Sequence, residues 1–187
     1  MGEGRKKLAI FDLDGTLFNT DEVNYCAYRD AFKEFGTELD RAFFVSECNG
    51  RHYKEFAPRI MGSDEHIEEV HKLKKENYSK YLDKAVMNVH LFEIIRLIKN
   101  EYIIALVTTA SRKNTEDILN HFEVLDLFDC LITQEDITKT KPDPEGFITT
   151  MKRFNIEPKE TVIFEDSDVG ILAAQRSGAS VMTVNAF

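Results

Sequence analysis

The chain has 187 residues, of which 43% are hydrophobic and 30% are charged, and this composition is typical of a folded globular protein rather than a disordered or fibrous one. Its 33 acidic and 24 basic residues give a net charge of −9. This balance argues against broad binding to nucleic acid or to an anionic membrane, because both need a basic face. We expect one large domain, or a core domain that carries an insert.

The first predicted element is a buried strand at residues 7–13, and the next strand does not begin until residue 102. We predict that most of the chain between them is helical, with no sheet element. Helical periodicity is clearest at residues 21–36 and 64–83. Two sets of side chains share a helix face: Val23, Cys26, Ala27, Ala31 and Phe35 in the first, and Ile67, Val70, Tyr78, Tyr81 and Leu82 in the second. These faces are interpreted as packing surfaces.

The rest of the chain alternates between strand and helix patterns. Near-continuous apolar runs predict buried strands at residues 102–108, 161–165 and 180–184, with a weaker candidate at 129–133. Helices are predicted between them, at residues 91–100, 112–122, 143–154 and 168–177, the last ending at Gly178. This order predicts an α/β fold with a doubly wound parallel sheet. We assign residues 1–18 and 87–187 to a Rossmann-like core and residues 19–86 to an inserted, all-helical cap domain.

Cysteine usage and the N-terminal residues bear on the compartment. Cys26, Cys48 and Cys130 are odd in number and include no C-x-x-C pair, so neither a disulfide framework nor a zinc ribbon is indicated. The first apolar run is too short for a signal peptide, and Asp12 interrupts it. No segment approaches the roughly 20 apolar residues of a membrane span. We therefore expect a cytoplasmic protein.

Two aspartates stand at the end of the first strand, in the stretch LAIFDLDGTLFN at residues 8–19. A carboxylate that leaves a buried strand must find water, a cation or hydrogen-bond donors, because desolvating it unpaired costs several kcal/mol. Asp12 and Asp14 make this demand twice. Taken alone, they are also explained by a solvated turn.

Other polar residues follow the later predicted strands or the loops after them. Since the carboxyl ends of parallel strands meet at one edge of a sheet, these residues are expected to converge on one crevice. The converging set is Asp12 with Asp14, Thr109, Lys141, and Glu165 with Asp166. Carboxylates, a hydroxyl and an ammonium suit phosphoryl transfer with a hard cation.

Four motifs in this order resemble those of the haloacid dehalogenase (HAD) superfamily. DLDGT at residues 12–16 is similar to its first motif, LVTTAS at 106–111 to its second, KTKPDPEGF at 139–147 to its third, and VIFEDSDVGILAAQRSGA at 162–179 to its fourth. The resemblance spans nearly the whole chain and is strongest to the branch of phosphatases and β-phosphoglucomutases with a helical, C1-type cap. It implies a Mg²⁺-dependent phosphatase that acts on a small phosphorylated metabolite, such as a sugar phosphate or a nucleotide.

Residue by residue, the resemblance implies the following chemistry. Asp12 is the nucleophile that becomes phosphorylated, and Asp14 is the general acid and base. Lys141 and Thr109 stabilise the charge on the phosphoryl oxygens. Mg²⁺ is held by the Asp12 carboxylate, the backbone carbonyl of Asp14 and the Asp166 carboxylate.

The remaining assignments concern substrate binding. Gly15 and Thr16 are expected to bring backbone N–H donors close to the phosphate. Ala110 follows the preferred hydroxyl residue, Thr109, for which Thr108 is the alternative. In the predicted cap, Arg51 is a candidate contact to the substrate. Glu165 either binds the metal through water or pairs with Lys141, behind the direct metal ligands.

Three alternative functions remain open from the sequence. The first is a phosphosugar mutase, although the position of that branch's usual cap histidine is occupied by Asn24. The second is a non-enzymatic phosphoacceptor domain, which would lack an insert of this length, and the third is a dehalogenase. A zinc site at His66 and His71 is disfavoured, because their spacing differs from that of H-E-x-x-H. We expect a monomer or a weak homodimer, with neither nucleic acid nor a membrane as partner.

Overall fold

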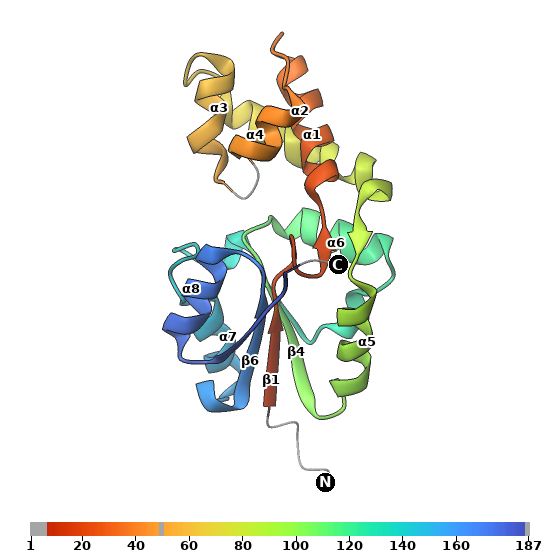
Figure 1. Cartoon of the computed structure of the whole chain (residues 1–187), viewed down its shortest axis with the longest axis vertical. Helices are drawn as coiled ribbons and strands as arrows, with labels where there is room; N and C mark the ends of the chain where they lie inside the picture. Colours follow the sequence, from red (N-terminus) through yellow and green to blue (C-terminus); the bar gives the residue numbers. More distant parts are fainter. Residues whose placement is uncertain (1–6, 49–50, 186–187) are drawn as a thin grey trace. The chain divides into compact units, whose positions relative to one another are not determined.

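The computed structural model describes residues 7–48 and 51–185 and contains a parallel five-stranded sheet (Figure 1). The strands lie in the order β5-β4-β1-β6-β7. Their bounds are β1 (Lys7–Phe11), β4 (Tyr102–Val107), β5 (Cys130–Ile132), β6 (Thr161–Glu165) and β7 (Ser180–Thr183). The chain moves from β1 outward through β4 to β5, then crosses back to β6 and β7. The predicted doubly wound α/β fold is therefore confirmed.

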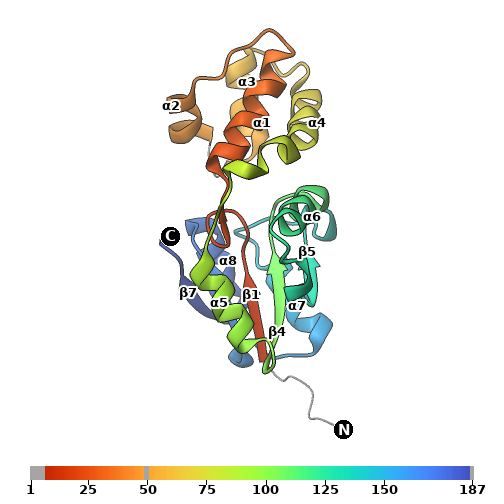
Figure 2. The ribbon, with the colours of Figure 1, turned by 90° about the vertical axis from the view of Figure 1, so that its right-hand side faces the viewer.

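Four helices cover the two faces of this sheet: α5 (Val89–Ile98), α6 (Arg112–His121), α7 (Glu145–Phe154) and α8 (Asp168–Ser177). Helices α5 and α6 lie on one face, and α7 and α8 lie on the other (Figures 1 and 2). Short 3₁₀ segments occur at Leu125–Leu127, Gln134–Asp136 and Pro158–Glu160. Helix α8 ends where predicted, at Gly178, whose φ of 82° is in the left-handed region that favours glycine.

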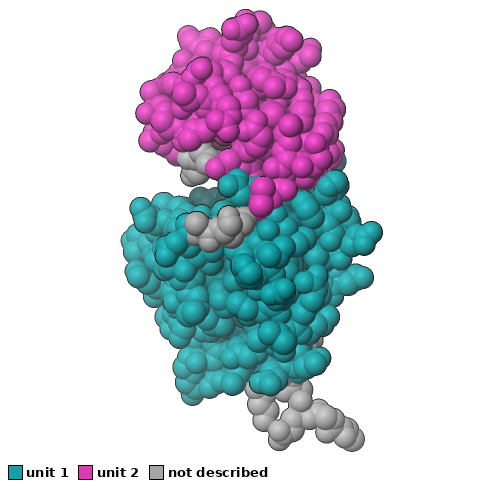
Figure 3. Space-filling view, turned by 45° about the vertical axis from the view of Figure 1, so that its right-hand side comes forward, with its two compact units in different colours: residues 1–19, 87–187 teal, residues 20–86 magenta. Residues whose placement is uncertain are grey.

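The chain divides into two compact units (Figure 3). Unit 1 comprises Met1–Asn19 and Met87–Phe187, and it contains the sheet with its four helices. Unit 2 comprises Thr20–Val86. The insert therefore leaves and re-enters unit 1 between β1 and α5.

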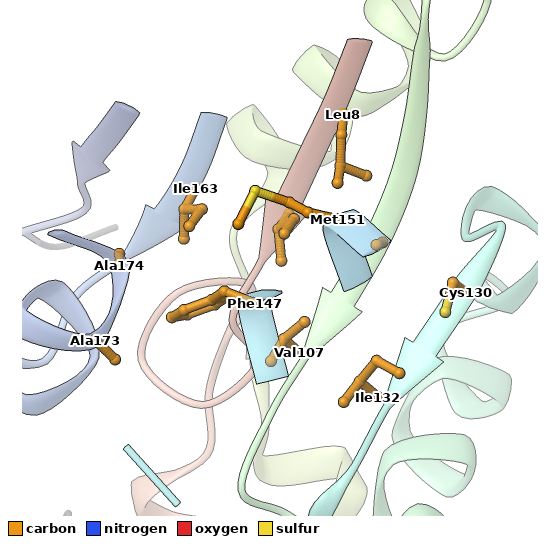
Figure 4. Packing of buried hydrophobic residues seen from close by; sticks show 11 residues of the cluster. Leu8, Val107, Cys130, Ile132, Phe147, Met151, Ile163, Ala173 and Ala174 are labelled. Carbon is orange, nitrogen blue, oxygen red and sulfur yellow. The ribbon is translucent and has the colours of Figure 1, made fainter. Parts of the chain in front are cut away.

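The core of unit 1 explains why the strands read as continuous apolar runs. Leu8, Ala9, Ile10 and Phe11 of β1 have no exposed surface, because helices cover both sides of the central strand. On the α7 and α8 side, strand residues pack against Phe147, Met151, Ala173 and Ala174 of the two helices (Figure 4). This packing holds the strands in place against α7 and α8, and so positions the residues at their carboxyl ends.

Unit 2 is built from α1 (Asp21–Lys33), α2 (Arg41–Phe43), α3 (Tyr53–Met61) and α4 (Ile67–Asn77), with a π-helical segment at Phe44–Cys48 and a 3₁₀ segment at Tyr78–Lys84. The predicted stripe on the first helix is confirmed for Val23, Cys26, Ala27 and Ala31, which are buried. The fifth predicted member, Phe35, is only partly buried and lies after α1, which ends at Lys33 rather than at residue 36. On the second stripe Val70, Tyr78 and Leu82 are buried, whereas Ile67 and Tyr81 are only partly covered.

The prediction that no sheet element lies between the first strand and residue 102 is wrong at both ends of the insert. Strands β2 (Phe18–Asn19) and β3 (Val86–Met87) form a separate two-stranded sheet. Two residues are too few to show an alternating pattern, so the sequence carried no signal for them. Likewise, β1 ends at Phe11 rather than at residue 13. Among the described residues, we find no helix with the length and apolar character needed to cross a membrane.

Candidate active site

The turn after β1 is fixed by backbone hydrogen bonds. The Asp12 N–H donates to the Phe164 carbonyl at 3.0 Å, and the Gly15 N–H donates to the Phe18 carbonyl at 2.8 Å. Gly15 has a φ of 88°, and a Cβ added there would lie 2.1 Å from Oδ2 of Asp166. Both the conformation and the close approach therefore require glycine. The turn presses directly against the carboxylate that follows β6.

Strand register brings the sequence motifs to one edge of the sheet. Phe11 pairs with Leu106 of β4 and with Phe164 of β6. The next residues along the three strands are Asp12, which directly follows β1, and Val107 and Glu165, which are the last residues of β4 and β6, so all three lie at the carboxyl edge of the sheet. Residues from three of the four motifs, far apart in the chain, therefore meet at one place.

Lys141 connects two of these strand ends. Its Nζ lies 2.5 Å from Oδ1 of Asp12 and 2.5 Å from Oε1 of Glu165, and it also donates to the Val107 carbonyl at 3.4 Å. The lysine side chain is only 9% exposed. Burial by itself lowers a lysine pKa, but the two carboxylates outweigh it and raise the pKa of Lys141 above its ordinary value. The side chain is therefore held as a buried ammonium ion.

Asp12 sits in an environment that disfavours its charge. Its residue is 6% exposed, and burial raises the pKa of its carboxyl group well above the usual value. The Lys141 ammonium opposes this shift, whereas the neighbouring Glu165 and Asp14 add to it. A buried carboxylate close to other acids is a candidate functional group.

Glu165 has no exposed surface and is held through both carboxylate oxygens. Oε1 accepts from Lys141, and Oε2 accepts from the backbone N–H groups of Asp166 and Ser167, both at 2.9 Å, and from the Ser167 hydroxyl at 3.0 Å. Of the two roles that the sequence left open for Glu165, the structure shows the contact with Lys141.

Asp166 faces the turn after β1. Its Oδ1 accepts a hydrogen bond of 2.6 Å from the hydroxyl of Thr16, which is itself fully buried. Burial raises the pKa of Asp166, and the Thr16 hydrogen bond partly offsets the shift. The Thr16 carbonyl accepts from the side-chain amide of buried Asn88 at 3.1 Å, which anchors the turn to the start of α5.

The two threonines after β4 differ in their surroundings. Thr108 is buried and its hydroxyl accepts from the Ala110 N–H at 3.0 Å, whereas the Thr109 side chain is exposed. Both threonines line a small pocket with Lys141. Its other lining residues are Val107, Ile137, Lys139, Asp143, Gly146 and Phe147. The N-cap of α6 is Ser111, whose hydroxyl accepts from the Asn114 N–H at 3.4 Å.

Two predicted site residues, Asp14 and Arg51, lie outside the buried contacts around Lys141. Asp14 is partly exposed and forms an isolated backbone bridge with Phe18, so it stays in the same turn as Asp12. Arg51 belongs to unit 2, where it is exposed and lies 3.8 Å from a carboxylate oxygen of Glu47. The role of each remains a prediction.

The donors present fit a hard divalent cation. Among residues 7–48 and 51–185, we find no group of three or more His, Cys, Asp and Glu side chains placed to hold a metal ion. A cation bound at this edge of the sheet would have the carboxylates of Asp12 and Asp166 and the backbone carbonyl of Asp14 as its candidate ligands. Oxygen ligands of this kind are those that Mg²⁺ prefers. The cation would also balance an excess of acidic groups around one lysine.

Sequence reasoning missed three residues that shape this site. Asn88 holds the Thr16 carbonyl, and Ser167 and Gly170 contact or crowd the Glu165 carboxylate. Asn88 and Ser167 are the N-caps of α5 and α8, so their positions before helices were the available signal. That signal indicates capping and says nothing of a second contact.

Comparison with known proteins identifies the class. The family model of the haloacid dehalogenase-like hydrolases matches residues 9–184. The chain is 34% identical over 182 residues to validoxylamine A 7'-phosphate phosphatase of Streptomyces hygroscopicus subsp. limoneus, covering 92% of this chain and 82% of that protein. It is 30% identical over 176 residues to a phosphorylated carbohydrates phosphatase of Thermotoga maritima, covering 90% and 80%.

A solved structure has the same fold. The crystal structure of CbbY from Rhodobacter sphaeroides in complex with phosphate superposes with a TM-score of 0.85 at 22% identity, and covers 97% of this chain and 87% of that one. The chain therefore belongs to the haloacid dehalogenase-like hydrolases. Within this family it is a phosphatase, as the two curated relatives described above are named.

Proposed function

We propose that this protein is a Mg²⁺-dependent phosphatase that hydrolyses a small phosphorylated carbohydrate through an aspartyl-phosphate on Asp12. The observation that carries the proposal is the buried contact of Lys141 with Asp12 and Glu165, each at 2.5 Å, at the edge of the sheet where Asp166 and Thr16 also meet. This arrangement places an ammonium and a buried carboxylate side by side. Such a pair suits attack on an anionic phosphate ester.

In the first half of the reaction, an oxygen of the Asp12 carboxylate attacks phosphorus and the bond to the substrate alkoxide breaks. Asp14 gives its proton to the departing alkoxide. The Lys141 ammonium stabilises the negative charge on the phosphoryl oxygens, since a preorganised charge in a buried site is worth more than in water. Asp12 then carries the phosphoryl group.

In the second half, Asp14 takes a proton from a water molecule that attacks the phosphorus of the aspartyl-phosphate. The bond between phosphorus and the Asp12 oxygen breaks, which restores the carboxylate and releases inorganic phosphate. We assign Mg²⁺ to the carboxylates of Asp12 and Asp166 and the carbonyl of Asp14. When bound, the cation neutralises charge that would otherwise repel an anionic substrate.

The hydroxyl that binds the phosphate is assigned to the loop after β4. Thr109 is exposed and lines the pocket, which suits contact with a ligand that enters from solvent. Thr108 is buried, and its hydroxyl already accepts from Ala110. We therefore keep Thr109 as the side-chain donor, with the turn of Gly15 and Thr16 supplying further donors.

Specificity is assigned to unit 2. We propose that unit 2, Thr20–Val86, acts as a cap domain that supplies substrate contacts, Arg51 among them. Phosphorylated carbohydrates are the favoured class because two of the curated relatives are named for phosphorylated carbohydrates and for validoxylamine A 7'-phosphate.

The test is steady-state release of inorganic phosphate from a panel of sugar phosphates and nucleotides, for the wild type and for Asp12→Asn. We expect turnover with Mg²⁺ that the variant lacks. Asp168→Asn is the matched control, since it makes the same chemical change at an exposed aspartate of α8. Undiminished turnover in Asp12→Asn would refute the proposed nucleophile.

Two alternative functions can be distinguished from the phosphatase by their products or by the lifetime of phosphorylated Asp12. A phosphosugar mutase would convert glucose 1-phosphate to glucose 6-phosphate without net phosphate release, as followed by NMR. A phosphoacceptor signalling domain would keep phosphorylated Asp12 for seconds or longer, whereas a phosphatase clears it quickly. Fast phosphate release without isomerisation supports the phosphatase.

A further inference from the structure

Helix α8 begins against the carboxylate that holds Lys141. The Ser167 hydroxyl donates to Oε2 of Glu165 at 3.0 Å and accepts from the Gly170 N–H at 3.1 Å. Because Ser167 is the N-cap of α8, its hydroxyl both caps the helix and binds the buried Glu165 carboxylate. The backbone N–H groups of Asp166 and Ser167 bind the same oxygen.

Gly170 makes room for this arrangement. It lies in the first turn of α8, where the helix does not need a positive φ, so its backbone conformation alone does not require glycine. A Cβ at this position would lie 1.8 Å from Oε1 and 2.0 Å from Cδ of Glu165. Any side chain would therefore push the carboxylate away from its position.

From these contacts we propose that Ser167 and Gly170 are positioning residues, which hold the Glu165 carboxylate so that it fixes the Lys141 ammonium against Asp12. Neither residue touches the reacting atoms. Oε2 of Glu165 takes the donors from the start of α8, and Oε1 is thereby aimed at Lys141. The partial positive charge of a helix N-terminus favours the same anion. This inference rests on the proposed function, because the mechanism needs Lys141 close to Asp12 and the two residues are proposed to keep it there.

The design separates capping from positioning. Ser167→Gly removes the hydroxyl, but glycine caps helices almost as well as serine. Ser167→Ala removes the hydroxyl and also the capping preference. Ser167→Thr keeps the hydroxyl. If the hydroxyl positions Glu165, kcat falls about 10-fold or more in the Gly and Ala variants alike and is largely restored in Thr, with KM changed much less. The free energy of unfolding follows a different order from kcat, because only Ser167→Ala clearly lowers it.

Gly170→Ala supplies the second arm. We expect it to lower kcat as the Ser167 variants do, because the added methyl group displaces the Glu165 carboxylate. Val169→Ala is the matched control, since Val169 is 46% exposed in the same turn of the helix. Wild-type kcat in Ser167→Gly or in Gly170→Ala, or a kcat that follows helix stability across the series, would overturn the proposal.

A readout that does not depend on catalysis distinguishes this proposal from the proposed function. Acetylation by acetic anhydride, followed by mass spectrometry, measures how well Lys141 is held, with the exposed Lys159 as internal standard. We expect faster labelling of Lys141 relative to Lys159 in Ser167→Gly and Gly170→Ala. If no phosphate ester is hydrolysed by the wild type, the proposed function fails, yet this labelling still decides whether the two residues hold Lys141. Unchanged labelling in both variants refutes the positioning role.

Discussion

Replacement of Lys141 by methionine tests the charge balance of the site. Methionine keeps an unbranched side chain and removes the ammonium that lies 2.5 Å from both Asp12 and Glu165. At an effective dielectric constant near 20, each contact corresponds to a Coulomb energy of about 7 kcal/mol. Most of this is cancelled by the cost of taking the three charges out of water. Loss of one partner from such a buried group leaves a net destabilisation of about 3–5 kcal/mol.

The pH dependence gives the sharper test. The pKa of Asp12 in the folded protein is already above the ordinary value of 3.8, and Lys141 is the main group that restrains it. Without Lys141 the folded-state pKa rises further. A raised carboxyl pKa leaves stability intact below pH 3.8 and lowers it as the pH rises through the folded-state pKa. The stability difference between Lys141→Met and the wild type should therefore be large at pH 7.5 and shrink at pH 4.5.

The assay is urea unfolding followed by circular dichroism with EDTA present. Hydrogen exchange of the β1 amides assigns the transition of unit 1, because the two units can open separately. Lys159→Met is the control, since Lys159 is 74% exposed and paired with Glu157 at the surface, and we expect no measurable change from it. A stability loss in Lys141→Met below about 1 kcal/mol at pH 7.5, or one that grows at pH 4.5, would refute the argument.

Three further outcomes are expected. Gly15→Ala should lower kcat/KM about 100-fold with the fold intact, because its Cβ would meet Asp166 at 2.1 Å; activity near that of the wild type would contradict this. EDTA should abolish phosphate release and Mg²⁺ should restore it, whereas full activity after chelation would exclude the proposed cation. Burial lowers the pKa of His71 to about 3, so unit 2 should lose stability as the pH falls from 6.5 towards 3, and less steeply in His71→Phe. Equal slopes in pH-dependent unfolding would show that His71 is not the cause.

The strands of the core could be predicted because buried strands have a recognisable sequence pattern. A strand covered on both faces needs apolar side chains at every position, as Leu8 to Phe11 show. The same logic fails for β2 and β3, each only two residues long. Their pairing comes from the path of the chain into and out of the insert rather than from side-chain pattern.

The candidate site could be predicted as a set of residues but not as a set of contacts. Motif order placed Asp12 and Asp166 directly after strands and Lys141 in a loop that follows one, and parallel topology then brought them to one edge. Which partner each long side chain selects depends on distances that a sequence does not contain. The sequence left pairing with Lys141 as one of two roles for Glu165, and only the structure shows that contact. It also shows what the sequence could not, that Thr108 is buried beside an exposed Thr109.

The distribution of partners among the acids indicates where the proposed cation would bind. Glu165 is satisfied within the protein, because it accepts from Lys141, two backbone N–H groups and a hydroxyl. Asp12 contacts the same lysine, and the Thr16 hydroxyl donates to the partly buried Asp166. Both of these groups have a raised pKa whose largest cause is burial. The charge that burial disfavours is thus concentrated on Asp12 and Asp166, the two carboxylates that we assign to Mg²⁺. A bound divalent cation would lower both pKa values and keep Asp12, the proposed nucleophile, ionised.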